Sequence, residues 1–283
     1  MQHVSTLSAL RAQVKTWRQQ NLQIAFVPTM GNLHQGHLSL VSKARELADR
    51  VVVSIFVNPL QFDDKADLSA YPRTLEADKQ QLTSVNSDLV FTPTSEIMYP
   101  DGMDNQTIIT VPGMDDKLCG RTRPGHFDGV ATVVVKLFNM VQPDIAVFGE
   151  KDYQQLLLIK KMVADLNMPI EVKGLPTLRE PNGLAMSSRN QYLTQQQCEQ
   201  ASALYRVLNE IKASLEAGKT DYAYLEQQAA DTLSQLGFEP DYVEIRHAGN
   251  LEPATTSDKA LRILVAARLG KARLIDSIAC DLE

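Results

Sequence analysis

The feature that most restricts the fold of this chain is an alternation of short apolar runs with helical patterns. The apolar runs predict strands at 23–27, 51–57, 88–91 and 145–148, and apolar residues at helical spacing predict helices at 74–85, 130–141 and 153–166. Strands that alternate with helices form a parallel sheet whose two faces are both covered. We therefore predict an α/β fold with a Rossmann-like parallel sheet and helices on both faces.

The pattern changes beyond Pro176. Residues 180–183 form a turn signal, and the remainder predicts helices at 194–217 and 222–236 followed by strands at 242–246, 261–267 and 274–278. This order of elements is typical of a separate α+β layer. We predict a first domain over 1–178 and a smaller C-terminal α+β domain over 179–283, with the boundary between 176 and 185.

Composition limits the possible partners. The chain of 283 residues is 44% hydrophobic and 22% charged, with a net charge of −6. An acidic balance argues against broad binding to nucleic acid or to anionic membranes, although local Lys and Arg can still bind a nucleotide. Cys119, Cys198 and Cys280 are odd in number and far apart, which suits a reducing compartment. We see no signal peptide and no apolar run near 18 residues, and we expect a cytoplasmic protein.

Residues 34–37, His-Gln-Gly-His, lie between the strand at 23–27 and a helical pattern that begins at Leu38. A helix N-terminus offers unpaired N–H groups and partial positive charge, and glycine lets a phosphate approach the backbone. The two imidazoles add hydrogen-bond donors without a fixed full charge. The segment therefore predicts a polyphosphate site. Half of a zinc site and ordinary surface histidines that cap a helix are the alternatives.

Further polar segments follow other predicted elements. Residues 186–189, Met-Ser-Ser-Arg, lie at the domain junction and can surround phosphate oxygens, although Ser-Ser-Arg is also common in surface loops. Residues 149–152, Gly-Glu-Lys-Asp, follow a strand: Lys151 can meet the charge of an α-phosphate, or the segment is a solvated turn. Gln61 and Gln155 carry amides that suit a substrate with hydroxyls beside a carboxylate. We expect residues 121–127 to shape the site.

These segments together resemble the pantothenate synthetase (pantoate–β-alanine ligase) family, within the class I adenylyl-transferring superfamily. The resemblance covers nearly the whole chain and is densest before residue 195. In that superfamily a His-x-Gly-His element and a Ser-containing basic loop close on the triphosphate from opposite sides. The matching segments are 27–34 with Gly36 and His37, 54–59 with Gln61 and Phe62, 71–73, 123–127, 136–139, 143–144, 148–156 and 187–190.

The resemblance implies an ATP-dependent reaction in two steps. Pantoate carboxylate attacks the α-phosphorus to give pantoyl adenylate and pyrophosphate, and the amine of β-alanine then displaces AMP. It implies catalytic roles for His37, as hydrogen-bond donor, for His34 and for Lys151, and it places pantoate at Gln61 and Gln155 and β-alanine at Gln61. The implied ATP contacts are Met30, Gly31, Asn32, Leu33, His34, Gln35, Gly36, His37, Gly149, Glu150, Lys151, Asp152, Leu178, Met186, Ser187, Ser188 and Arg189.

The resemblance also implies a homodimer and Mg²⁺ between the ATP phosphates, with no metal ligand assigned to the protein. If both the 34–37 and the 187–189 segments hold one triphosphate, ATP bridges the two predicted domains, and we expect the C-terminal domain to act as a lid. In-line attack needs positioning and charge neutralisation rather than a protein nucleophile, which agrees with these residues. Three alternatives stay open: a nucleotidyltransferase that acts on a phosphate-bearing acceptor, a non-enzymatic module that senses ATP, and a fragment of an RNA-charging synthetase. The first would require extra Lys or Arg near Gln61 and Gln155.

Overall fold

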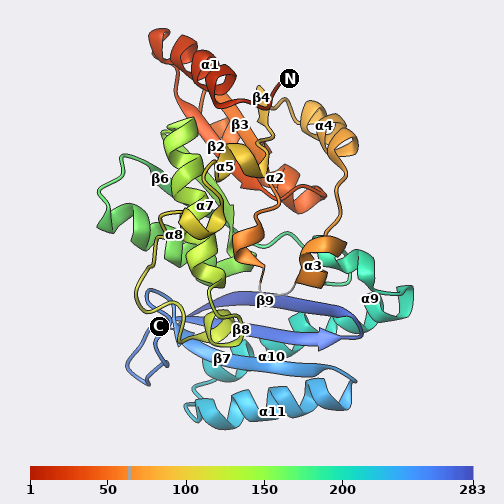
Figure 1. The fold of residues 1–283 in the computed structure, drawn as a ribbon. Helices are drawn as coiled ribbons and strands as arrows, with labels where there is room; N and C mark the ends of the chain where they lie inside the picture. The colour runs from red at the N-terminus through yellow and green to blue at the C-terminus, as the bar shows by residue number, and fades with distance from the viewer. Residues whose placement is uncertain (63–64, 283) are drawn as a thin grey trace. The chain divides into compact units, whose positions relative to one another are not determined.

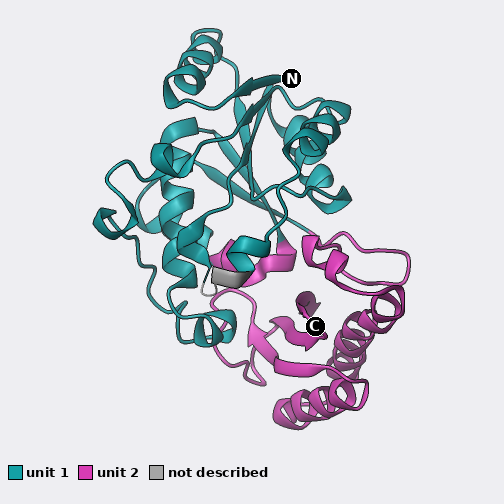
Figure 2. Ribbon diagram, turned by 45° about the vertical axis from the view of Figure 1, so that its right-hand side comes forward, with its two compact units in different colours: residues 1–149, 158–175 teal, residues 150–157, 176–283 magenta. Residues whose placement is uncertain are grey.

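The computed structural model describes residues 1–62 and 65–282, which form two compact units (Figure 2). The first unit contains Met1–Gly149 and Leu158–Leu175, and the second contains Glu150–Leu157 and Pro176–Glu283. The segment Glu150–Leu157 thus groups with the second unit although its neighbours in the chain on both sides belong to the first.

The first unit is built on a six-stranded parallel sheet with the strand order β1-β4-β3-β2-β5-β6 (Figure 1). This confirms the predicted α/β class and the four predicted strands, while the short β1 and the polar edge strand β6 were not predicted. The strands are β1 (Gln2–Val4), β2 (Ile24–Thr29), β3 (Arg50–Ile55), β4 (Leu89–Phe91), β5 (Ile145–Gly149) and β6 (Glu171–Leu175).

Helices cover both faces of this sheet because side chains alternate along each buried strand. Ala25 and Val27 of β2 belong to a core cluster with Leu38 and Val41 of α2 (Gln35–Leu47). Phe26 points the other way, and its ring lies 6.2 Å from that of Phe138 on α7 (His126–Val141). The other helices are α1 (Leu7–Gln19), α3 (Lys65–Ala70), α4 (Leu75–Ser84), α5 (Ser95–Met98), α6 (Leu118–Thr122) and α8 (Tyr153–Asp165).

The strand order places a topological switch point between β2 and β5. From β2 the chain adds β3 and β4 on one side, and it then returns to add β5 and β6 on the other. The β2–β5 ladder ends at Phe26 and Ala146, whereas β2 stays paired with β3 as far as Thr29. Pro28 has no N–H group to extend a ladder. Open α/β sheets bind ligands at the carboxyl ends of strands at such a point.

The second unit has an antiparallel sheet packed on helices. The order is β7-β8-β9, and one face of the sheet joins a core with Leu204, Leu208 and Leu233. The predicted helix 194–217 is in fact two helices that meet at Ser202, whose hydroxyl bonds to the carbonyl of Glu199 at 2.7 Å. The elements are α9 (Gln195–Ala201), α10 (Ala203–Glu216), α11 (Tyr222–Gln235), β7 (Glu239–His247), β8 (Ala260–Leu269) and β9 (Ala272–Asp281). Within residues 1–62 and 65–282, none of the helices is long and apolar enough to span a lipid bilayer.

Candidate active site

The turn between β2 and α2 depends on two residues with left-handed backbone. Gly31 has φ +83° and Asn32 has φ +51°. A Cβ atom on Gly31 would lie 2.9 Å from Cγ2 of Ile55 on the neighbouring strand. Glycine is therefore required here by both the backbone conformation and the close packing. The turn carries the chain from the carboxyl end of β2 directly into the N-terminus of α2.

A buried carboxylate holds the backbone of the turn between β2 and α2. Asp78 of α4, only 1% exposed, accepts hydrogen bonds from the backbone N–H groups of Asn32 at 3.0 Å and Leu33 at 2.8 Å. The hydroxyl of Thr74 bonds to the same carboxylate at 3.2 Å. Sequence reasoning did not identify Asp78. The available signal was a carboxylate on the buried face of a predicted amphipathic helix, where an unpaired charge is costly.

His34 and His37 form the cap of α2. The Nδ1 atom of His34 accepts from the N–H of Gly36 at 3.1 Å, and Nδ1 of His37 accepts from the N–H of His34 at 3.4 Å. A ring nitrogen that accepts carries no proton, so in both neutral rings the proton is on Nε2. The ring centres are 4.1 Å apart. Both histidines therefore cap α2, and in each ring the nitrogen that carries the proton, Nε2, is a donor of the kind that binds phosphate.

Gln61 is held by a buried polar network. It ends η1 (Pro59–Gln61), where its Oε1 accepts from Nδ2 of Asn58 at 3.2 Å and its Nε2 lies 3.1 Å from the sulfur of Met30. Asn58 is fully buried, and its Oδ1 accepts from the hydroxyl of Tyr99 at 2.6 Å. Burial raises the pKa of Tyr99, which keeps this hydroxyl protonated. Gln61 and the 30–37 turn thus belong to one region of the first unit.

The backbone of Gln61 is anchored by the 121–127 loop. Arg123 donates to Nε2 of His126 at 3.1 Å, so the ring proton is on Nδ1, which donates to the carbonyl of Gln61 at 2.8 Å. Arg123 also donates to that carbonyl at 3.2 Å. Helix α7 can pack closely against η1 because Gly129 has no side chain: a Cβ atom there would lie 2.3 Å from the carbonyl oxygen of Leu60. The 121–127 loop thus holds the main chain of Gln61, and its role in shaping the site stays a prediction.

In the second unit, the segment after β5 forms the short helix η3 (Glu150–Asp152). The ammonium group of Lys151 lies 3.7 Å from the carboxylate of Asp152, and the Lys151 side chain is only 18% exposed. Glu150 pairs with Arg262 of β8 at 3.1 Å. Gln155 lies on the first turn of α8 and is half-buried. Lys151 and Gln155 therefore lie on two consecutive helices, η3 and α8.

The remaining predicted ATP contacts lie on a hairpin and the short helix that follows it. The N–H of Met186 donates to the carbonyl of Leu178 at 3.0 Å across the hairpin, whose turn at 180–183 was predicted. Ser187 caps η4 (Ser188–Tyr192) by accepting from the N–H of Arg189 at 3.2 Å. This pairing explains why Leu178 accompanies the 186–189 segment despite their separation in the sequence.

A salt bridge fastens the hairpin to β9. Arg179 forms a bidentate pair with the buried Asp276, with N–O distances of 2.5 and 2.9 Å, and its guanidinium stacks 3.7 Å from the ring centre of Tyr205. The same guanidinium donates to the carbonyl of Gly183 at 3.1 Å. Bidentate, stacked arginines hold planar partners in one orientation, so the hairpin has a fixed place on the C-terminal sheet.

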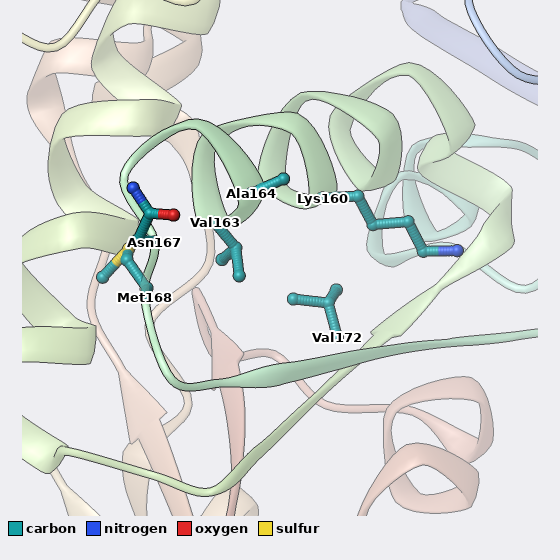
Figure 3. Close-up of a pocket in the computed structure, with 6 residues that line it drawn as sticks. All are labelled: Lys160, Val163, Ala164, Asn167, Met168 and Val172. Atoms are coloured by element: carbon teal, nitrogen blue, oxygen red, sulfur yellow. The ribbon is translucent and has the colours of Figure 1, made fainter.

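A cleft of about 400 Å³ lies elsewhere in the first unit (Figure 3). Its lining includes Met168, just before β6, and Val172, near the start of that strand, so it lies toward the amino ends of the strands. It contains none of the predicted site residues. Among the residues that the structure describes, no three His, Cys, Asp or Glu side chains gather in a possible metal site.

The fold and these segments define a Rossmann-like α/β protein in which a glycine-containing turn leads into a helix N-terminus beside the topological switch point. A family model described as Pantoate-beta-alanine ligase matches residues 2–279. The chain belongs to the pantoate–β-alanine ligase family.

Individual relatives agree over almost their whole lengths. Pantothenate synthetase of Pseudomonas putida is 56% identical over 100% of this chain and 99% of its own. The crystal structure of pantothenate synthetase from Thermus thermophilus is 45% identical, with a TM-score of 0.91 over 98% of this chain and 99% of the other. The Francisella tularensis pantoate–β-alanine ligase, crystallised with beta-gamma ATP and β-alanine, is 36% identical, with a TM-score of 0.83 over 98% and 97% of the two chains.

Proposed function

We infer that this protein condenses pantoate with β-alanine to form pantothenate, in an ATP-dependent reaction that passes through pantoyl adenylate. Family membership over residues 2–279 carries the inference. The complex of the Francisella tularensis enzyme with beta-gamma ATP and β-alanine supports the same substrates for this chain. The product is a precursor of coenzyme A, so the activity belongs to vitamin B5 biosynthesis.

The proposed chemistry has two balanced steps. A carboxylate oxygen of pantoate attacks the α-phosphorus of ATP, and the bond to pyrophosphate breaks. The uncharged amine of β-alanine then attacks the acyl carbon, AMP leaves with the bonding electrons, and the nitrogen gives up its proton. The first step gathers negative charge on phosphate oxygens, where fixed donors lower the barrier. We propose that Nε2–H of His34 and His37 and the ammonium of Lys151 supply these donors.

We propose that ATP contacts the 30–37 turn, the 149–152 segment, Leu178 and the 186–189 segment. Three features support this assignment: the N-terminus of α2, the Nε2 protons, and the pairing of Leu178 with Met186 across the hairpin. Mg²⁺ bound mainly through phosphates and water would need few protein ligands, and we therefore assign it none. Chelation of Mg²⁺ by EDTA is then expected to stop pyrophosphate release.

We propose that Gln61 and Gln155 bind pantoate and that Gln61 also lies near β-alanine. The side-chain partners of Gln61, Asn58 and Met30, are uncharged. An amide that can both donate and accept suits a hydroxyl-bearing acid, while the cation beside Gln61, Arg123, is bonded to the Gln61 main-chain carbonyl.

The deciding experiment follows pyrophosphate and AMP separately. With ATP and pantoate alone, one pyrophosphate per enzyme should appear quickly, followed by little more. Addition of β-alanine should then give AMP and pantothenate in equal amounts. Continuous pyrophosphate release without pantoate, or AMP formation that needs no β-alanine, would contradict this function. Sedimentation and cell fractionation would test the homodimer and the cytoplasmic location that we also propose.

Replacement of Gln155 with alanine is expected to raise the pantoate concentration needed for half-maximal rate. A hydroxyl of the substrate loses a hydrogen bond that contributes about 0.5–1.5 kcal/mol, which corresponds to a several-fold rise in that pantoate concentration. Binding of ATP, measured by calorimetry, should stay nearly unchanged and serves as the internal control. An equal loss of ATP affinity would place Gln155 in the nucleotide subsite instead.

We also propose that the second unit acts as a lid, because ATP contacts are assigned to residues of both units. A ligand that binds both favours the closed state by its differential affinity for that state. Arg189→Ala should therefore slow adenylation and let water hydrolyse the adenylate, whereas Arg189→Lys should recover only part of the loss because the planar fork is gone. Arg206→Ala, at an exposed arginine of α10, is the matched control.

The lid prediction is measured as the ratio of AMP to pantothenate at limiting β-alanine, together with hydrogen exchange over 176–190 with and without ATP. The ratio should exceed one in Arg189→Ala and equal one in the wild type and in Arg206→Ala. A ratio of one in Arg189→Ala, with hydrogen exchange unaffected by ATP, would mean that the second unit does not move when ATP binds.

A further inference from the structure

Arg262 of β8 is a buried arginine of the C-terminal sheet, and its hydrogen bonds reach Glu150, the residue before Lys151. Arg262 is 4% exposed. Its guanidinium donates to the carboxylate of Glu150 at 3.1 Å and to the carbonyl of Glu150 at 3.3 Å. It also donates to the hydroxyl of Ser277 on β9 at 3.0 and 3.2 Å. The planar guanidinium of Arg262, with its five N–H donors, thus bonds Glu150 and Ser277 at the same time.

The other contacts of this cluster restrain the same short segment at both ends. The hydroxyl of Ser277 donates to the carbonyl of Glu150 at 3.0 Å. The guanidinium carbon of Arg262 lies 4.0 Å from the ring centre of Tyr153, whose hydroxyl donates to the carbonyl of Ala248 at 3.0 Å. Burial raises the pKa of Tyr153, so this donor keeps its proton. Lys151 lies between the two restrained residues.

These contacts account for the grouping of Glu150–Leu157 with the second unit. The chain leaves β5 at Gly149, and from Glu150 onward its backbone is bonded to side chains of β8 and β9. A buried guanidinium loses its hydration, and this cost is offset only where hydrogen bonds satisfy it. Here that requirement forces the backbone of Glu150 into one place, because a planar donor fork tolerates little displacement of its partners.

We propose that Arg262 is a positioning residue for Lys151, with Ser277 as its accessory, so that the C-terminal sheet sets the place of the ammonium group at the α-phosphate during adenylate formation. The proposal rests on the proposed function, in which Lys151 neutralises charge at that phosphorus. Displacement of a catalytic group by about 1 Å can lower a rate roughly 10²-fold. Arg262 contributes by preventing this displacement of Lys151, and it needs no contact with the substrate.

The test is a double-mutant cycle on single-turnover pyrophosphate release with MgATP and pantoate. Arg262→Lys keeps the charge but loses the fork, and it should lower the rate constant roughly 10- to 100-fold while the KM for pantoate changes little. Lys151→Ala should lower it more. Because Arg262 acts through Lys151, Arg262→Lys should cost almost nothing further in the Lys151→Ala background. A purely structural role would give the same factor in both backgrounds.

Arg273→Lys is the matched control. Arg273 of β9 pairs with Asp241 at 2.6 Å in the same sheet, and its side chain is 15% exposed against 5% for Arg262. It should lower the thermal midpoint as Arg262→Lys does and leave the rate constant unchanged. Ser277→Ala keeps the arginine and removes one anchor of Glu150, so it should give a smaller rate loss that also vanishes in the Lys151→Ala background.

The outcomes separate this proposal from the proposed function. Wild-type protein that releases no pyrophosphate with MgATP and pantoate would refute the function itself. If the wild type is active, a normal rate in Arg262→Lys, or equal losses with and without Lys151, would overturn the positioning role. If Arg262→Lys does not fold, Ser277→Ala decides by the same criterion of a loss that depends on Lys151.

Discussion

Replacement of His37 or His34 with alanine is expected to lower the rate of adenylate formation about 10²–10³-fold, the usual cost of one lost donor to a transition state. The rings sit at the N-terminus of α2 with both Nδ1 atoms occupied by backbone N–H groups. The proton of each neutral ring is therefore on Nε2, and we expect this N–H group to donate to the phosphate. Single-turnover pyrophosphate release is the measurement, because it reports the first chemical step alone.

The capping role of His34 must be separated from its chemical role. His34→Ala removes a cap and should cost about 1 kcal/mol of stability. His34→Asn restores an acceptor at the N-cap position but has no Nε2–H, so it should be close to wild type in stability and still slow in catalysis. His247→Ala is the control, since Nδ1 of His247 accepts from the N–H of Gly249 at 3.1 Å in the same local arrangement. Near-wild-type release by both His34→Asn and His37→Ala would refute the donor role.

Replacement of Asp78 with asparagine should lower both stability and activity. The carboxylate accepts two backbone N–H groups of the 30–37 turn, whereas an amide offers one acceptor and turns a donor toward the other N–H. A buried donor left unsatisfied costs about 1–3 kcal/mol. Because the turn carries the proposed ATP contacts, its displacement should also lower adenylate formation roughly 10²-fold.

Asp144→Asn provides the comparison for Asp78→Asn. The carboxylate of Asp144 accepts from the N–H of Ile24 at 2.7 Å and pairs with Arg18. Ile24 is the first residue of β2, whose other end leads into the 30–37 turn. Its loss should lower the denaturation midpoint but leave the rate constant of the folded enzyme unchanged. If both variants have the same activity when folded, Asp78 is a structural support without influence on the site.

The alternating pattern of the first half was sufficient to predict the parallel sheet. Local hydrophobic periodicity reports burial directly, so the strands at 23–27 and 145–148 were found, and helices on both faces followed. The His-Gln-Gly-His segment could be placed at a helix N-terminus for the same reason. The edge strand β6 was missed because its residues Glu171–Leu175 are only partly buried and show no apolar run.

The tertiary structure decided what holds the predicted site residues. Asp78, Tyr99 and Arg262 lie far in the sequence from the residues they bond, and an isolated Asp, Tyr or Arg carries no local signal of its partner. Side-chain hydrogen bonds between distant segments depend on which elements the fold makes neighbours. Periodicity and turn chemistry thus determined the elements and the residue types of the candidate site. The buried hydrogen bonds that hold Gln61 and the 30–37 turn in the first unit, and those that hold Glu150 in the second, arise only when the strands and helices of each unit pack.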